Sequence, residues 1–320
     1  MALLTLWALV NAVGALSVYF WQPGGFGTPT NDAMRVVFVI PGSPGAKAGI
    51  VPGDLIDESP TPFAQRRLSS HMPAPGARET IRVVHGTRSR VVTLTAYKLP
   101  LRYFGIGPYD VAKVLVSSII VVLGALLVLM RPSILTWAFF IYCVGLKNDV
   151  FGPLSWMYYI PHWLWVGFRL LGAFLDAAGW TAFLIFAILF PLNYAKGRIS
   201  RTAMWLLLTL FALSLTAQVL IVITFHPSLT APIELATALL AYAAAMAIFV
   251  ANYRRARSDG RQRIRWVMIG LAIALTIHVI NVAAELLMFV DIPAWFFYAA
   301  IFLPLAMPVS VVYAIARYRV

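Results

Sequence analysis

The sequence predicts an α-helical polytopic membrane bundle of about eight transmembrane helices, with one small α/β domain inserted between the first and second helices. Three observations predict this fold class. The 320 residues are 61% hydrophobic and only 12% charged, whereas soluble domains are about half apolar and a quarter charged. Residues 24–103 differ from the rest, with ten Lys or Arg and five Asp or Glu. Twelve of the other fifteen basic residues gather beside long apolar runs.

The first apolar run, Leu3–Trp21, has about the length that crosses a bilayer. We therefore expect residues 1–22 to form the first transmembrane helix. A cleaved signal peptide is the alternative, but the run has no positively charged start and no convincing cleavage triplet. These absences favour a retained anchor.

Residues 24–103 predict a water-facing domain of short strands and turns. Val36–Ile40 is expected to be a buried strand, and Thr80–Val84 and Arg90–Ala96 flank a turn at His85–Thr87, which is typical of a hairpin. Pro62–Met72 is expected to form one short helix. About eighty residues is near the lower size limit for a domain that folds alone.

Residues 111–316 predict a bundle of seven further helices, because apolar runs return and dominate. The second of these runs is short, and Lys147 and Asp149 would lie at its outer end. Residues 317–320 would begin a cytoplasmic segment. The expected helices are Val111–Met130, Ser133–Leu146, Trp163–Phe190, Ala203–Phe225, Ile233–Asn252, Trp266–Val290 and Ala294–Ala316.

The distribution of basic residues predicts the orientation. The net charge is +13, and twelve of the 25 basic residues border apolar runs. Basic segments mark the cytoplasmic side and contact anionic lipid headgroups. We therefore expect a multi-pass protein of a bacterial inner membrane, with membrane lipids as partners, both termini cytoplasmic and the α/β domain outside. The twelve are Arg131, Lys196, Arg198, Arg201, Arg254, Arg255, Arg257, Arg261, Arg263, Arg265, Arg317 and Arg319.

Composition also limits the classes of function. No basic, water-facing domain with interleaved aromatic residues is present, so nucleic acid is not an expected partner. Cys143 is the only cysteine, which excludes a disulfide or a cysteine-based zinc site within the chain. No metal or cofactor is expected.

The segment from Val37 to Ile56, VFVIPGSPGAKAGIVPGDLI, resembles the core signature of a bacterial PDZ domain, and the resemblance extends over residues 36–96. Its turn residues support it independently. Ser43 can cap a short helix that starts near Pro44, and Gly49 can provide a left-handed exit from that helix. Pro52-Gly53-Asp54 can form a tight turn into the strand Leu55-Ile56.

The PDZ resemblance implies a groove in which an extended peptide, or the C-terminus of a protein, adds to a sheet edge beside a helix. The implied groove residues are Val37, Phe38, Val39 and Ile40, with Phe63 and Leu68 on the helix, and the implied carboxylate loop is Gly25, Phe26 and Gly27. Three alternatives stay open. Residues 25–27 could be a linker, Phe63 and Leu68 could be core residues, and the domain could dock partners without any peptide.

Three further stretches resemble the membrane portion of multi-pass bacterial sensor histidine kinases, some of which carry an outer PDZ domain. They are Phe183–Pro191, Arg261–Gly270 and Val312–Val320. In that family the last stretch leads into a cytoplasmic signalling helix, whereas here the transmitter is missing. None of the five histidines suits phosphotransfer, and no glycine-rich nucleotide loop follows. No catalytic residues are therefore expected in this chain.

Charged residues within a membrane span are costly and are functional candidates. Arg169 and Asp176 stand seven positions apart, about 10 Å along one helical face. His278, Asn281 and Glu285 form a stripe on another helix, and Glu234 lies near the outer end of a third. These six residues, called the polar set below, could hold the helices together or line a cavity that opens outward and senses a ligand or protons.

The function expected from these observations is a membrane input module of two-component signal transduction, in which the PDZ-like domain binds a peptide or protein outside. A second copy of the chain is a further possible partner. The alternative is a PDZ-containing membrane scaffold or transporter-like protein without signalling output. A zinc protease is disfavoured because the His-Glu-x-x-His pattern is absent.

Overall fold

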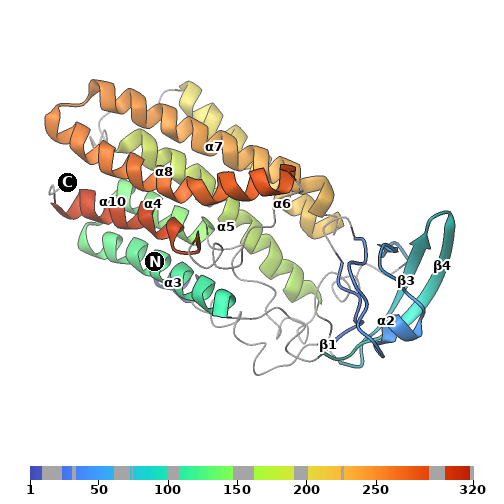
Figure 1. Ribbon diagram of the computed structural model, residues 1–320. Helices are drawn as coiled ribbons and strands as arrows, with labels where there is room; N and C mark the ends of the chain where they lie inside the picture. The colour runs from blue at the N-terminus through green and yellow to red at the C-terminus, as the bar shows by residue number, and fades with distance from the viewer. Residues whose placement is uncertain are drawn as a thin grey trace.

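The computed structural model describes residues 1–8, 24–30, 34–60, 73, 75–99, 108–146, 162–190, 201–224, 227–287 and 300–317. They form a bundle of helices and a small sheet domain, which lies at one end of the bundle (Figure 1). The predicted combination of a mostly helical protein with one small sheet domain is therefore confirmed.

The sheet domain contains two antiparallel sheets. β1 (Gly24–Gly25) pairs with β5 (Tyr97–Lys98), and the larger sheet has the order β2-β3-β4. Its strands are β2 (Leu55–Asp57), β3 (Arg78–His85) and β4 (Arg88–Thr95). The predicted hairpin is confirmed, with β3 and β4 joined at Gly86-Thr87. The core of the domain comprises Val36, Ile50, Ile56, Ile81, Val83 and Leu94.

The predicted turn chemistry is confirmed around α2 (Pro44–Lys47). The Ser43 hydroxyl accepts a hydrogen bond from the Ala46 N–H at 3.2 Å, as an N-cap does. Gly49 and Gly53 have φ angles of +69° and +90°, which side-chain-bearing residues rarely adopt. Both glycines therefore fulfil the backbone roles that their spacing predicts.

The prediction of a buried strand over Val36–Ile40 is wrong. Only Val36 and Ile40 are buried, whereas Val37 and Phe38 are 57% and 44% exposed, and the segment makes no regular ladder. The Val37 N–H donates to the Pro29 carbonyl, and the Ile40 N–H donates to the Gly27 carbonyl. Because Pro29 has no N–H to return, a two-way ladder cannot form with the neighbouring segment.

Most predicted helices of the bundle are present. Residues 2–8 are helical at the start of the first predicted span, whose remainder lies outside the described residues. The helices are α3 (Pro108–Met130), α4 (Ile134–Leu146), α5 (His162–Leu189), α6 (Arg201–Thr224), α7 (Pro227–Arg255) and α8 (Ser258–Leu287). Four of them have boundaries within three residues of the prediction, whereas α7 and α8 begin six and eight residues earlier than predicted.

The last predicted helix differs. In place of one helix over 294–316, the described part has a helical residue at Ala300, a turn at 301–302, the 3-10 turn η5 (Leu303–Leu305) and then α10 (Ala306–Arg317). Pro304 and Pro308 lack the N–H that a continuous helix would use there, so the helix is interrupted before α10. The 12 residues of α10 span about 18 Å, less than the hydrocarbon thickness of a bilayer.

By length and apolar composition, one described helix is a candidate membrane span, Val166–Leu189 within α5. Val114–Met130, Ile134–Gly145, Met204–Ala217 and Leu303–Ile315 are shorter apolar stretches. This criterion does not confirm eight crossings, and their number stays a prediction.

Glycines allow two pairs of helices to approach closely. A Cβ on Gly145 of α4 would lie 2.7 Å from the Cα of Gly179 on α5, so no side chain fits there. A Cβ on Gly270 of α8 would lie 2.6 Å from the Ala306 carbonyl oxygen at the start of α10. Small residues that let backbones approach are typical of helix contacts in membranes.

Candidate functional site

Residues 25–27, the predicted carboxylate loop, are packed against the turn that precedes α2. Gly25 pairs with Tyr97, and the Phe26 carbonyl accepts a hydrogen bond from the Gly45 N–H at 2.8 Å. Gly27 has a φ angle of +75°, and a Cβ there would collide with Ser43. A Cβ on Gly25 would likewise collide with the Leu99 side chain, so close packing explains both glycines, and the carbonyls of Phe26 and Gly27 bond to the domain itself.

The predicted groove strand presents an apolar surface. Val37 and Phe38 are exposed, while Val39 packs partly against the core and Ile40 is buried. Phe63 and Leu68, the predicted helix side of the groove, lie outside the described residues. The groove therefore stays a prediction. The exposed side chains of Val37 and Phe38 are the observation that supports it.

Two aspartates organise the start of the three-stranded sheet. Asp54 is 2% exposed, and it accepts a hydrogen bond from the Val51 N–H at 3.0 Å and contacts His85 Nδ1 at 2.6 Å. Asp57 accepts hydrogen bonds from the N–H and hydroxyl of Ser59, and Arg82 Nη1 lies 3.1 Å from its carboxylate. Partial burial raises the pKa of Asp57, but these hydrogen bonds and the Arg82 charge outweigh it, so the pKa is below its ordinary value.

The polar set lies on the helices that the sequence predicts, with Arg169 and Asp176 on α5, Glu234 on α7 and the remaining three on α8. Among their side chains, only that of Asp176 is described, and it is 6% exposed. The α5–α7 contacts Phe186–Phe249 and Trp180–Tyr242 have nearly the same offset in sequence, so the two helices run in parallel. This register places buried Thr237 at the level of Asp176.

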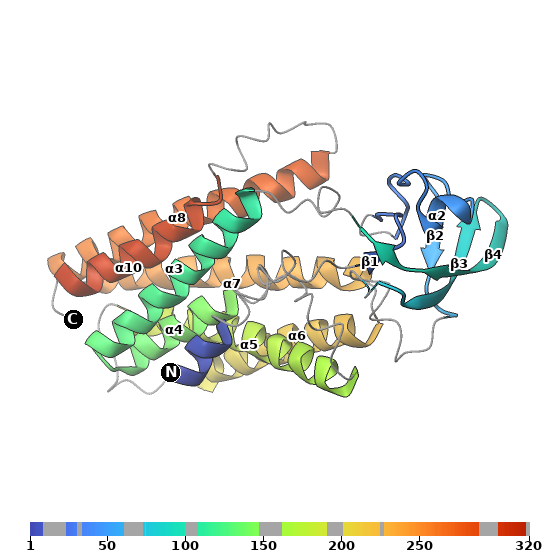
Figure 2. The ribbon, with the colours of Figure 1, turned by 90° about the horizontal axis from the view of Figure 1, so that it is seen from below.

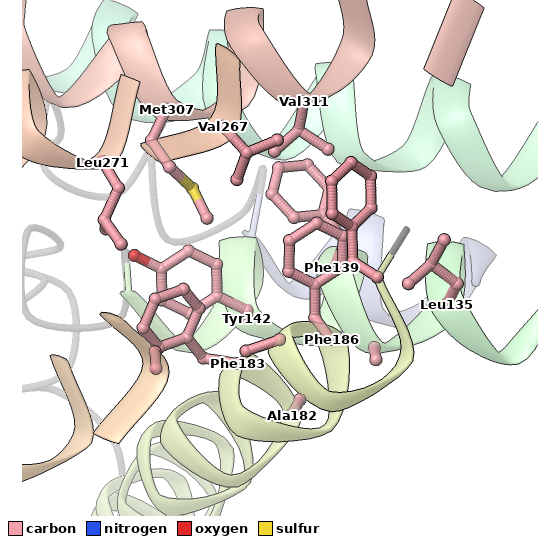
Figure 3. Packing of buried hydrophobic residues seen from close by; sticks show 14 of the residues in the cluster. Leu135, Phe139, Tyr142, Ala182, Phe183, Phe186, Val267, Leu271, Met307 and Val311 are labelled. Atoms are coloured by element: carbon pink, nitrogen blue, oxygen red, sulfur yellow. The ribbon is translucent and has the colours of Figure 1, made fainter. Parts of the chain in front are cut away.

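An aromatic cluster next to this level was not anticipated from the sequence. Tyr142 of α4 stacks on Phe183 of α5 with ring centroids 4.5 Å apart, and Trp180 meets Tyr242 of α7 edge to face at 5.1 Å. The hydroxyls of Tyr142 and Tyr242 interact with each other electrostatically inside the apolar core. Figure 3 shows Leu271 of α8 and Met307 of α10 beside the rings of Tyr142 and Phe183. The sequence contains one signal for this contact, which is the presence of a tyrosine in each of two separate apolar runs.

The helix ends opposite the sheet domain are rich in arginine. Figure 1 places the α7–α8 turn and the end of α10 at that end of the bundle. Arg254, Arg255, Arg257, Arg261 and Arg265 are exposed there. The side-chain amide of Asn252 donates to the carbonyls of Ala187 and Phe190 at 3.0 and 2.9 Å, which joins the ends of α5 and α7.

The outer surface of the bundle is apolar. Large apolar side chains on several helices are between 47% and 69% exposed, an arrangement that soluble monomers avoid over extended areas. Among the described residues, no group of three or more His, Cys, Asp or Glu is placed to hold a metal ion. The exposed apolar residues include Leu115, Leu126, Leu129, Trp205, Leu206, Leu208, Leu213 and Leu240.

No family model matches the chain, and no curated protein and no solved structure matches it significantly.

Proposed function

We propose that the chain is a membrane-embedded input module of bacterial signal transduction, with a PDZ-like outer domain that binds a protein or peptide. The supporting observation is the arrangement of the long helices. α5, α7 and α8 have 28, 29 and 30 residues, which at about 1.5 Å each gives 42–45 Å. Each helix thus links the end beside the sheet domain with the arginine-rich end.

The apolar outer surface supports a lipid environment, and the arginine-rich end supports a cytoplasmic location for that end. In this orientation the sheet domain lies outside the cell. An eight-span bundle with cytoplasmic termini then places the basic short loops in the cytoplasm. The polar set then occupies the middle and outer parts of the membrane, where Asp176 is a buried carboxylate. A carboxylate at that depth is a candidate for sensing protons or a ligand.

The first experiment tests the orientation. Reporters of cytoplasmic location are fused after Arg198 or Arg257, and a third is inserted at Gly76 in the turn before β3. We expect the first two to report inside and the third outside. An inside signal at Gly76 would place the binding domain in the cytoplasm and remove the proposed function.

The second experiment separates an input module from the alternative scaffold. A kinase transmitter is fused after Val320, and its autophosphorylation is measured in membranes with the native outer domain, with Gly53→Val and with Gly53→Asn. Disruption of the domain by valine should change the output, whereas asparagine, which tolerates positive φ, should not. Equal output from all three proteins favours the scaffold.

A further inference from the structure

The surface of the sheet domain is strongly cationic because its acidic residues point inward. Within its described residues, three of the four acids, Asp54, Glu58 and Glu79, are buried. The fourth, Asp57, already faces Arg82. All of the described Lys and Arg side chains of the domain are exposed, namely Arg35, Lys47, Arg78, Arg82, Arg88, Arg90 and Lys98. The solvent therefore meets an excess of positive charge.

This charge borders a strand edge. In the sheet order β2-β3-β4, strand β4 is the outer strand among the described residues. Arg88, Ser89, Arg90 and Val91 are four consecutive exposed residues, and Val91 is an apolar side chain that is 57% exposed. An outer strand presents backbone N–H and C=O groups that can pair with another chain. We call these four residues the β4 edge.

The chemistry of the β4 edge specifies its occupant. Side chains alternate along a strand, so Arg88 and Arg90 lie on one face of the sheet and Val91 on the other. A strand added here could place acidic residues at alternate positions opposite Arg88 and Arg90. The residues between those positions would lie on the other face of the sheet, where an apolar side chain could contact Val91. A lipid surface fits less well, because β4 is the strand farthest from the helices in both views (Figures 1 and 2).

We propose that the β4 edge is a docking site for an extended acidic segment of a partner protein, which adds to β4 as a further strand. Cross-strand pairing with Arg88 and Arg90 sets its register, and Val91 contacts its apolar residue. Arg90 is held in place on the domain side, because its guanidinium donates to the Gly49 carbonyl at 2.6 Å. This site is separate from the predicted groove at residues 37–40 and does not require a free carboxyl terminus.

The test uses the full chain in nanodiscs of zwitterionic lipid and a fluorescent heptapeptide of alternating Glu and Val. The peptide is acetylated and amidated, so it offers no terminal carboxylate to the predicted groove. We expect saturable binding that weakens about fivefold in Arg88→Glu, because an exposed pair is replaced by a repulsion. The matched control Lys47→Glu makes the same charge change on α2 and should alter the affinity less than about twofold.

Backbone pairing is tested with two N-methylated peptides. Methyl groups on one alternating set of amides should abolish binding, whereas methyl groups on the other set should leave it unchanged, because only one edge of the peptide faces β4. Equal losses in Arg88→Glu and Lys47→Glu would show diffuse charge attraction and overturn the proposal. An absence of peptide binding would also overturn the proposal. So would a result in which the protein binds vesicles containing phosphatidylglycerol, with an affinity that falls in Arg88→Glu, but does not bind the peptide.

Discussion

His85 Nδ1 lies 2.6 Å from Asp54 Oδ1, and this contact joins the end of β3 to the turn that starts β2. The other carboxylate oxygen of Asp54 accepts the Val51 N–H, so one buried side chain holds both the turn and the strand. The aspartate is buried, whereas the histidine side chain is 71% exposed. The two partners therefore contribute unequally to the fold.

Asp54→Ala should destabilise the sheet domain by about 1–3 kcal/mol, because the Val51 N–H loses its acceptor in the turn. The matched change His85→Ala removes only the exposed partner and should cost clearly less. Hydrogen exchange of residues 50–57 in the full chain measures both. Equal losses would contradict the role assigned to the Val51 hydrogen bond.

Gly53→Val should unfold or strongly weaken the turn, because a branched side chain is strained at a φ of +90°. A Cβ at this position meets nothing within 4 Å, so the cost would arise from the backbone conformation alone. Gly53→Asn, with a residue that tolerates positive φ, is the control. Limited proteolysis of the full chain should cut the valine variant within residues 50–57 and spare the asparagine variant.

Asp57→Asn should reduce the stability of the β2–β3 pairing at neutral pH, by an amount typical of an exposed ion pair, below about 1 kcal/mol. The pKa of Asp57 is lowered in the folded protein from 3.8. Its contribution is therefore present above the unfolded value and is lost as the pH falls through the lower folded value. Hydrogen exchange should show a difference between the two proteins at pH 7 that disappears in strong acid. A difference that persists there would point to lost packing.

Gly145→Ala should destabilise the bundle, because the new methyl group would lie 2.6 Å from the Leu175 carbonyl oxygen and 2.7 Å from the Gly179 Cα. Overpacking of this kind typically costs about 1–3 kcal/mol. Gly167→Ala, also on a helix, meets open space and should be neutral or slightly stabilising. Thermal unfolding in detergent compares them. A Gly145 variant as stable as the parent would mean that α4 and α5 can separate without loss.

Tyr142→Phe and Tyr242→Phe should each weaken the bundle by about 1–3 kcal/mol, because each removes the polar group that interacts with the other buried hydroxyl. The double variant should cost less than the sum of the two. A double-mutant cycle in detergent measures this coupling. Strictly additive losses would show that the two hydroxyls act independently.

The parts of the fold that depend on local chemistry could be predicted from the sequence. The cap at Ser43, the left-handed glycines and the β3–β4 hairpin follow from residues a few positions apart. The prediction of a strand at Val36–Ile40 was wrong because the pairing of this segment depends on Pro29. Pro29 belongs to a neighbouring segment whose sequence does not predict a strand.

In the candidate sites, too, features that depend on local sequence could be predicted, whereas features that depend on contacts between distant segments could not. The positions of Asp176 and Arg169 on α5 follow from helical periodicity. The Tyr142–Tyr242 contact and the Gly145–Gly179 crossing join helices that are adjacent only in space, and apolar runs do not specify which faces meet. The burial of Asp54, Glu58 and Glu79, which makes the domain surface cationic, likewise depends on the folded sheet.

The hydrogen bonds from Asn252 to Ala187 and Phe190 have a mechanical consequence. The last carbonyls of a helix have no hydrogen-bond partner within the helix. Here they are fastened to a side chain that lies three residues before the end of α7 at Arg255. An axial shift of α5 would therefore be transmitted through Asn252 to the α7–α8 turn, which carries Arg257 and Arg261.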